Sequence, residues 1–271
     1  MLSIIGITPH PPIIIPEVGG DRIAEVEKTV SGLKKLSRYI ESLEPGLVIV
    51  ITPHGQVTYE GPSIQAAQRL TGNFGQFGCP GLEISLETDL KLLDLVIEEA
   101  TKKKVPPVIL DNRSSKFLGQ GNLDHGATVP LYYLRQEGLD APGLHIAFSY
   151  QPYEKLYSFG SALRQAVERR GLKTAVIASG DLSHRLIPGA PAGYDPRGKE
   201  FDQLLVRLIK EKKVDEMLKI DGQLVEAAGE CGLRSFIIAL GMLDGADFQS
   251  EIISYEGPFG VGYLVAALRP S

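Results

Sequence analysis

The feature that most constrains the fold of this chain is an alternation of short, uncharged apolar runs with longer amphipathic stretches. Residues 1–8 and 47–51 carry no charge, which is typical of strands that are buried on both faces of a sheet. Between them, residues 21–43 place apolar side chains every three or four positions, the spacing of one helix face. Strands that alternate with helices predict an α/β fold with a mostly parallel or mixed central sheet, covered by helices on both faces.

The same alternation continues to the end of the chain. Further helices are predicted at residues 88–103, 127–136, 153–170, 197–212, 214–220 and 233–243. Further strands are predicted at residues 108–110, 144–148, 174–179, 251–255 and 262–268, and the last two are expected to pair as an antiparallel hairpin at a sheet edge. No linker divides the 271 residues, so we expect a single domain over residues 1–271.

Composition excludes several classes of protein. The net charge of −5 gives no basic field for nucleic acid. The most apolar runs, residues 47–51 and 236–243, are shorter than the roughly 18 residues of a membrane span, and residues 1–6 lack the basic region of a signal peptide. Two cysteines are too few for a disulfide framework. We therefore expect a cytoplasmic protein that binds neither nucleic acid nor membrane, with a homodimer as the default assembly.

A repeated tetrapeptide points to a functional site. The sequence Ile-Thr-Pro-His ends two predicted strands, at residues 7–10 and 51–54. Because α/β sheets hold ligands just beyond the carboxyl ends of their parallel strands, we expect His10 and His54 to meet at one sheet edge. The predicted strand at residues 174–179 sends Asp181 and His184 to the same edge.

Three more positions carry groups that suit a metal centre. His125 lies in a loop beside Asp124, and Glu230 and Cys231 stand side by side before a predicted helix. Two imidazoles and one carboxylate leave three open positions on an octahedral ion, an arrangement that suits non-haem Fe(II). His145, by contrast, lies inside a predicted strand and is expected to be a structural histidine outside the site.

The motifs that hold these residues resemble the LigB superfamily, which comprises the catalytic subunits of class III extradiol ring-cleaving dioxygenases and the related MEMO-like proteins. The resemblance covers nearly the whole chain, and the chain looks most like the bacterial and archaeal MEMO/LigB-like branch. It implies a LigB-like α/β fold. The motifs are Thr-Pro-His-Pro-Pro at 8–12, Thr-Pro-His-Gly at 52–55, Asp-His-Gly at 124–126, Gly-Asp-Leu-Ser-His at 180–184, Glu-Cys-Gly at 230–232 and Tyr-Glu-Gly-Pro-Phe-Gly-Val-Gly-Tyr at 255–263.

The resemblance implies a role for each candidate residue. In the ring-cleaving enzymes, the positions of His10, His54 and Glu230 hold the metal. The position of His184 is the acid/base histidine, and that of His125 lines the substrate site. MEMO-like proteins instead use a cysteine and a histidine around the metal, here Cys231 and His184. Asp124 and Asp181 are expected to orient the neighbouring histidines from behind.

The leading functional prediction is an oxidoreductase of aromatic catabolism, an Fe(II)-dependent extradiol dioxygenase that opens a catechol ring with O2. On this reading Glu230→Ala abolishes iron binding and Cys231→Ala spares it. One alternative is a MEMO-like regulatory protein that holds copper or iron and cleaves no ring. The other alternative is a zinc-dependent hydrolase, since two histidines and a glutamate also suit catalytic zinc. Substrate specificity is predicted to lie in Gly- and Pro-rich loops at residues 56–81 and 186–197.

Overall fold

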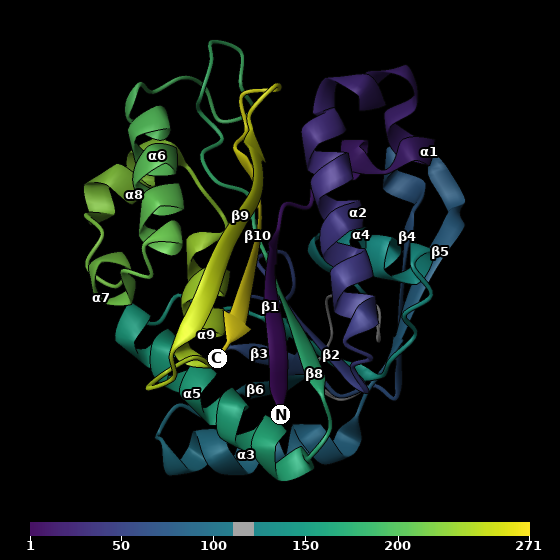
Figure 1. Cartoon of the computed structure of the whole chain (residues 1–271), viewed down its shortest axis with the longest axis vertical. Coiled ribbons are helices and arrows are strands. Elements are labelled where there is room, and N and C mark those ends of the chain that lie inside the picture. The colour runs from purple at the N-terminus through teal and green to yellow at the C-terminus, as the bar shows by residue number, and fades with distance from the viewer. Residues whose placement is uncertain (111–121) are drawn as a thin grey trace.

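A computed structural model describes residues 1–110 and 122–271, and its main feature is one mixed sheet of eight strands. The strand order is β6-β3-β7-β2-β8-β1-β10-β9, and the chain runs through this sheet as shown in Figure 1. The strands are β1 (Leu2–Thr8), β2 (Leu47–Thr52), β3 (Ser63–Gln65), β6 (Val108–Leu110), β7 (Gly143–Ala147), β8 (Thr174–Ser179), β9 (Phe248–Glu256) and β10 (Tyr263–Pro270).

The middle of the sheet is parallel and one end of it is antiparallel. Strand β8 pairs in parallel with β1 on one side and with β2 on the other, and β2 pairs in parallel with β7. Strands β9 and β10 pair antiparallel, with β9 at the sheet edge. The structure therefore confirms both the mixed α/β fold and the terminal hairpin that the sequence predicted.

Helices cover both faces of the sheet, as Figure 1 shows. One face carries α2 (Glu27–Ser42) and α4 (His125–Gln136), and the other carries α3 (Leu90–Lys102), α5 (Tyr153–Arg170) and α9 (Leu233–Gly241). Three shorter or outer helices, α6 (Arg197–Lys210), α7 (Val214–Met217) and α8 (Gly222–Ala228), lie beyond α9 on that second side. In the described part of the chain, none of the helices has the length and apolar character to cross a membrane.

Alternating side chains of the central strands fill two separate cores. Along β2, Leu47, Ile49 and Ile51 pack in the core that contains α5 and α9. Val48 and Val50 point the other way, into the core that contains α2 and α4. Because both faces of the strand are covered, every residue of β2 is buried, which explains its uninterrupted apolar run.

The structure departs from the sequence prediction in several places. No helix is predicted at α1 (Pro16–Gly19) or at α8, and the helix predicted at residues 214–220 ends at Met217. Residues 21–43 are not one helix, because a 3₁₀ segment at Gly20–Val26 precedes α2 and Val26 leaves the helical conformation between them. Residues 56–81 are not simply a loop. They contain β3, the strand β4 (Arg69–Phe74) and the start of β5 (Cys79–Glu87), and β4 and β5 form a second, antiparallel sheet. Glycines and polar residues interrupt its buried apolar positions, which hides the strand pattern.

Candidate metal centre

His10 lies at the centre of the site, and contacts with β8 and with the residues after it hold both its backbone and its ring. It follows β1 at the carboxyl edge of the sheet and is 1% exposed. Its backbone N–H donates to the Asp181 carboxylate over 3.1 Å, and its Nδ1 lies 2.9 Å from the hydroxyl of Ser179, the last residue of β8. A proton on Nδ1, donated to that hydroxyl, leaves the Nε2 lone pair free to bind a metal.

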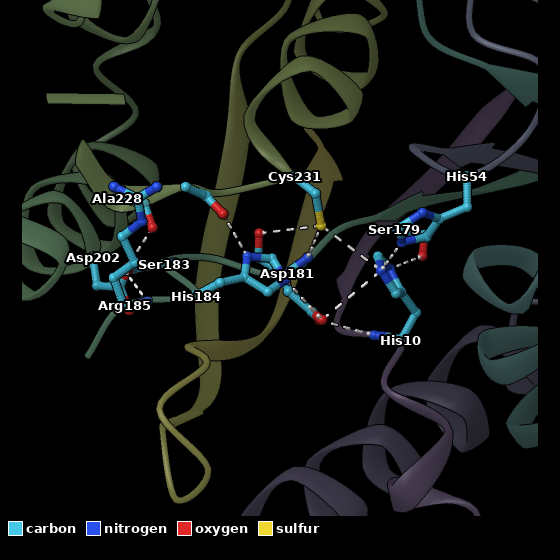
Figure 2. A network of polar contacts seen from close by, with 11 residues as sticks. His10, His54, Ser179, Asp181, Ser183, His184, Arg185, Asp202, Ala228 and Cys231 are labelled. Atoms are coloured by element: carbon cyan, nitrogen blue, oxygen red, sulfur yellow. Dashed lines mark hydrogen bonds and ion pairs between the residues drawn. The ribbon is translucent and has the colours of Figure 1, made fainter. Parts of the chain in front are cut away.

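Three possible ligand atoms surround His10 Nε2, and Figure 2 shows the contacts of this group. His54 Nε2 lies 2.9 Å away, Cys231 Sγ 3.7 Å away and an Asp181 carboxylate oxygen 3.8 Å away. Two groups of three residues therefore present ligand atoms that all lie within 4.8 Å of one another: His10, His54 and His125, and His10, Asp181 and Cys231. The repeated Pro-His motif thus brings two histidines from separate strands into contact.

The protonation of these histidines suits a metal site. Burial lowers the pKa of His10 to about 3 and that of His54 to about 3, and burial also lowers the pKa of His125. All three rings are therefore neutral at neutral pH and carry lone pairs. The rings of His54 and His125 stack with their centroids 4.1 Å apart. The histidine of the second Pro-His motif is therefore in contact with the first residue of α4.

Glu230 and Cys231 are neighbours in the chain, but their side chains make different contacts. The Glu230 carboxylate accepts a hydrogen bond of 2.6 Å from the backbone N–H of Leu233, in the first turn of α9. Cys231 Sγ instead accepts from the backbone N–H of Asp181 over 3.3 Å and faces His10. Glu230 belongs to neither group of candidate ligands among the described residues.

Burial raises the pKa of Glu230 to about 7 and raises the pKa of the Cys231 thiol. A thiol in this position is neutral until a cation binds, and a bound metal ion deprotonates a coordinating thiol outright. A donor set of imidazoles, one sulfur and one carboxylate fits iron, zinc or copper better than a hard cation such as calcium.

His184 extends the site beyond Asp181. Its Nδ1 lies 2.7 Å from the backbone carbonyl of Gly229, which can only accept, so Nδ1 carries the proton. In the neutral ring the Nε2 atom then keeps its lone pair, and it lies 3.9 Å from the Asp181 carboxylate. Asp181 thus lies between His10 and His184, and burial raises the pKa of this carboxyl to about 6.

Asp124 does not orient His125 by a direct hydrogen bond to its ring in the part of the chain that the structure describes. Its carboxylate accepts from the Thr52 hydroxyl and from His145 Nε2, each over 2.7 Å. His145 was expected to lie outside the site, and the structure links it to the site through this carboxylate. The only sequence signal was a titratable residue within an otherwise apolar strand.

A cavity of about 460 Å³ opens beside the histidines. His54, Asp124 and His125 lie in its wall. The Phe77 ring also lines it and packs edge-on against the His125 ring, with the ring centroids 5.8 Å apart. Other lining residues come from β3, from the β4–β5 sheet and from the segments around them: Gly55, Gln56, Gln65, Thr71, Gly72, Asn73, Gln76, Glu83, Asn122 and Leu123. Residues of the 56–81 segment therefore line the space where a ligand of the centre would lie.

Asp202 supports the His184 loop from behind. Its carboxylate accepts hydrogen bonds from the Ser183 N–H over 2.8 Å and from the Tyr255 hydroxyl over 2.6 Å. Burial raises the pKa of Asp202 to about 6.

This pKa predicts a pH dependence of stability. Since the unfolded residue has a pKa of about 3.9, the folded state binds this proton more tightly, and deprotonation favours unfolding. The free energy of unfolding is expected to fall by about 2–3 kcal/mol between pH 4 and pH 7 through this residue alone. Urea unfolding of the wild type and of Asp202→Asn across that range isolates the effect. If the free energy of unfolding fell equally with pH in the two proteins, this role of Asp202 would be contradicted.

The fold and the histidine cluster define a class: an α/β protein with a candidate metal centre at the carboxyl edge of parallel strands. The family model described as the catalytic LigB subunit of aromatic ring-opening dioxygenase matches residues 5–266. The chain therefore belongs to the LigB family.

Similarity to individual proteins agrees with this assignment. Protein CA_C1420 of Clostridium acetobutylicum is 36% identical over 262 residues, which are 96% of this chain and 56% of that protein, so the chain spans little more than half of this relative. The 2-aminophenol 1,6-dioxygenase beta subunit of Pseudomonas sp is 23% identical over 96% of this chain and 91% of its own length. The crystal structure of the uncharacterized protein JW3007 from Escherichia coli K12 has the same fold, with a TM-score of 0.63, 15% identity and coverage of 98% of this chain and 99% of its own.

Proposed function

We propose that this protein is an Fe(II)-dependent extradiol dioxygenase that opens the ring of a catecholic aromatic compound with O2. The observation that carries the proposal is the group of ligand atoms around His10 Nε2, together with the position of His54 and His125 in the wall of a cavity of about 460 Å³, large enough for an aromatic ring. Membership of the LigB family and the similarity to the 2-aminophenol 1,6-dioxygenase subunit support the same reaction class.

The residues present fit a metal ion. His10 and His54 would hold it, and Cys231 is the third ligand that the geometry favours, in place of the Glu230 carboxylate that the resemblance to ring-cleaving enzymes suggested. When bound, Fe(II) would acidify the hydroxyl groups of a catechol and make its reaction with dioxygen possible.

The remaining residues would handle the substrate and its protons. In the neutral ring of His184 the Nε2 atom carries no proton, so this atom would accept a proton from a catechol hydroxyl and return it later. His125 would donate a hydrogen bond to the substrate from the cavity wall. The Phe77 ring beside His125 would contact the face or edge of the aromatic substrate.

The test is oxygen uptake by protein loaded anaerobically with Fe(II). Neutral, carboxylated and amino-substituted catechols and 2-aminophenol would be offered in turn, with consumption of one O2 per substrate and the absorbance of the ring-opened product as the two readouts. We expect uptake with at least one of these compounds, and His10→Ala serves as a metal-free control. No uptake from any compound at full iron occupancy would contradict the proposal.

A second function is favoured by one specific observation, the position of Cys231 beside His10. A sulfur ligand together with imidazoles suits copper, and a metal-binding protein of the MEMO-like kind would need no ring cleavage. Metal analysis of protein purified without added metal separates the possibilities. Iron with oxygen uptake supports the dioxygenase, copper without uptake supports the MEMO-like protein, and zinc with esterase activity supports a hydrolase.

A further inference from the structure

One carboxylate joins the elements that present two of the clustered histidines. Asp124 accepts from the hydroxyl of Thr52, the last residue of β2, and from Nε2 of His145 in β7. The same residue is the N-cap of α4, and His125 is the first residue of that helix. The carboxylate therefore connects β2, β7 and α4 at the edge where the metal centre lies.

The Thr52 hydroxyl extends this connection to His54. It donates to Asp124 and accepts the backbone N–H of His54 over 3.2 Å. The residues around these contacts are closely packed. A Cβ on Gly126 would lie 2.2 Å from Thr52 Oγ1, and a Cβ on Gly55 would lie 3.2 Å from the His145 ring. The backbones of His54 and His125 are thus both fixed relative to Asp124.

His145 is the residue that holds Asp124 from the other side. It lies opposite Val50 in the parallel pairing of β2 and β7, and it is 2% exposed. Its Nδ1 has no hydrogen-bond partner among the described residues, so Asp124 is the one polar group there that its ring engages. An imidazole that only filled the core would be less favourable than an apolar side chain of the same size, because burying an unpaired polar atom costs free energy.

We propose that His145 is a positioning residue of the metal centre, which acts through Asp124 to hold His54 and His125 together. This inference rests on the proposed function, in which those two histidines would face the metal and the substrate. His145 belongs to neither group of candidate ligands among the described residues, and its Nε2 is engaged by Asp124.

The first test is Zn²⁺ affinity, measured by competition with a chromophoric chelator. His145→Leu keeps the volume but removes the donor, and we expect it to weaken binding by about 10–100-fold, as the loss of a group that supports a ligand does. His145→Gln keeps an N–H near the Nε2 position and is expected to stay within about threefold of the wild type. Ile146→Val is the matched control, because it trims the adjacent buried residue of the same strand on the opposite face and should lower stability without a change in affinity.

Two outcomes overturn the proposal: Zn²⁺ affinity unchanged in His145→Leu, or equally weakened in His145→Gln. If His145→Leu fails to fold, Thr52→Val replaces it, since it removes the other hydrogen bond to Asp124 at nearly constant volume. A similar loss of affinity in Thr52→Val supports the proposal, and an unchanged affinity overturns it.

A second readout needs no metal and separates this inference from the proposed function. The chain has five histidines, so ¹⁵N-resolved ring spectra of the metal-free protein are simple to assign. We expect His145 in the Nε2–H tautomer, and we expect His145→Leu to shift the ring signals of His54 and His125 but not those of His184. If the wild type binds no Zn²⁺, the metal function fails, and the ring signals still decide the positioning role. Unshifted His54 and His125 signals would overturn it.

Discussion

Cys231→Ala is expected to weaken metal binding by about 100-fold or more, whereas Glu230→Gln is expected to leave it within about threefold. Cys231 Sγ lies 3.7 Å from His10 Nε2, a separation that allows one ion to contact both atoms. The Glu230 carboxylate is engaged elsewhere, since it accepts the N–H of Leu233 in the first turn of α9. Glutamine keeps an oxygen acceptor there, and alanine would cost about 1 kcal/mol of stability through the lost hydrogen bond.

The measurement uses cobalt as a spectroscopic probe of the ligands. Co²⁺ bound to a thiolate gives an intense near-ultraviolet charge-transfer band, so the wild type and Glu230→Gln should both show it and Cys231→Ala should not. Thermal unfolding of the metal-free proteins controls for damage to the fold. Loss of metal in Glu230→Gln together with full binding in Cys231→Ala would contradict the sulfur assignment and would restore the carboxylate set of the ring-cleaving enzymes.

The sequence could predict the meeting of His10 and His54 because two simple rules suffice. Uncharged β-branched runs form buried strands, and parallel strands end at one sheet edge. Strands β1 and β2 both pair with β8, so the residues that follow them arrive within hydrogen-bond distance of each other. The residues after β8 join them by the same rule, which brings Asp181 against the His10 ring.

The roles of Glu230 and Cys231 could not be decided in this way. They are adjacent, and both precede the same helix, so no periodicity distinguishes them. Which residue can bind a metal depends on which of the two side chains accepts a free N–H group at the start of α9. The Glu230 side chain accepts the N–H of Leu233, and the Cys231 side chain then faces His10.

The contribution of His145 and of the β4–β5 sheet depends on contacts between distant segments. His145 lies within a buried strand, and among the described residues its Nε2 has a partner because Asp124, 21 residues earlier in the chain, packs against it. Strands β4 and β5 carry glycine, asparagine and proline among their apolar residues, so each has a weak pattern by itself. Their buried residues, such as Leu70 and Leu86, become part of a core only when they pack with α4.

His184→Gln is expected to lower kcat for ring opening by about 10²–10⁴-fold, the usual contribution of a general acid/base, while the Kd of the catechol changes little. The carbonyl of Gly229 accepts the Nδ1 proton, which leaves Nε2 as the atom that exchanges protons in the neutral ring. Gly229 can present that carbonyl from a left-handed conformation, with φ +60°, that most other residues avoid. Glutamine places its amide near the position of Nε2, but it cannot carry a proton near neutral pH.

The experiment separates proton transfer from metal binding. Anaerobic titration of the Fe(II) protein gives the catechol Kd, single-turnover oxygen consumption gives the rate of the chemical step, and metal content is measured on the same samples. Full iron with a slow chemical step supports the acid/base role. An unchanged rate would contradict it. A residue that only moves protons can be replaced without a change in metal affinity. Loss of iron from His184→Gln would therefore show that His184 is a metal ligand, as in the MEMO-like arrangement.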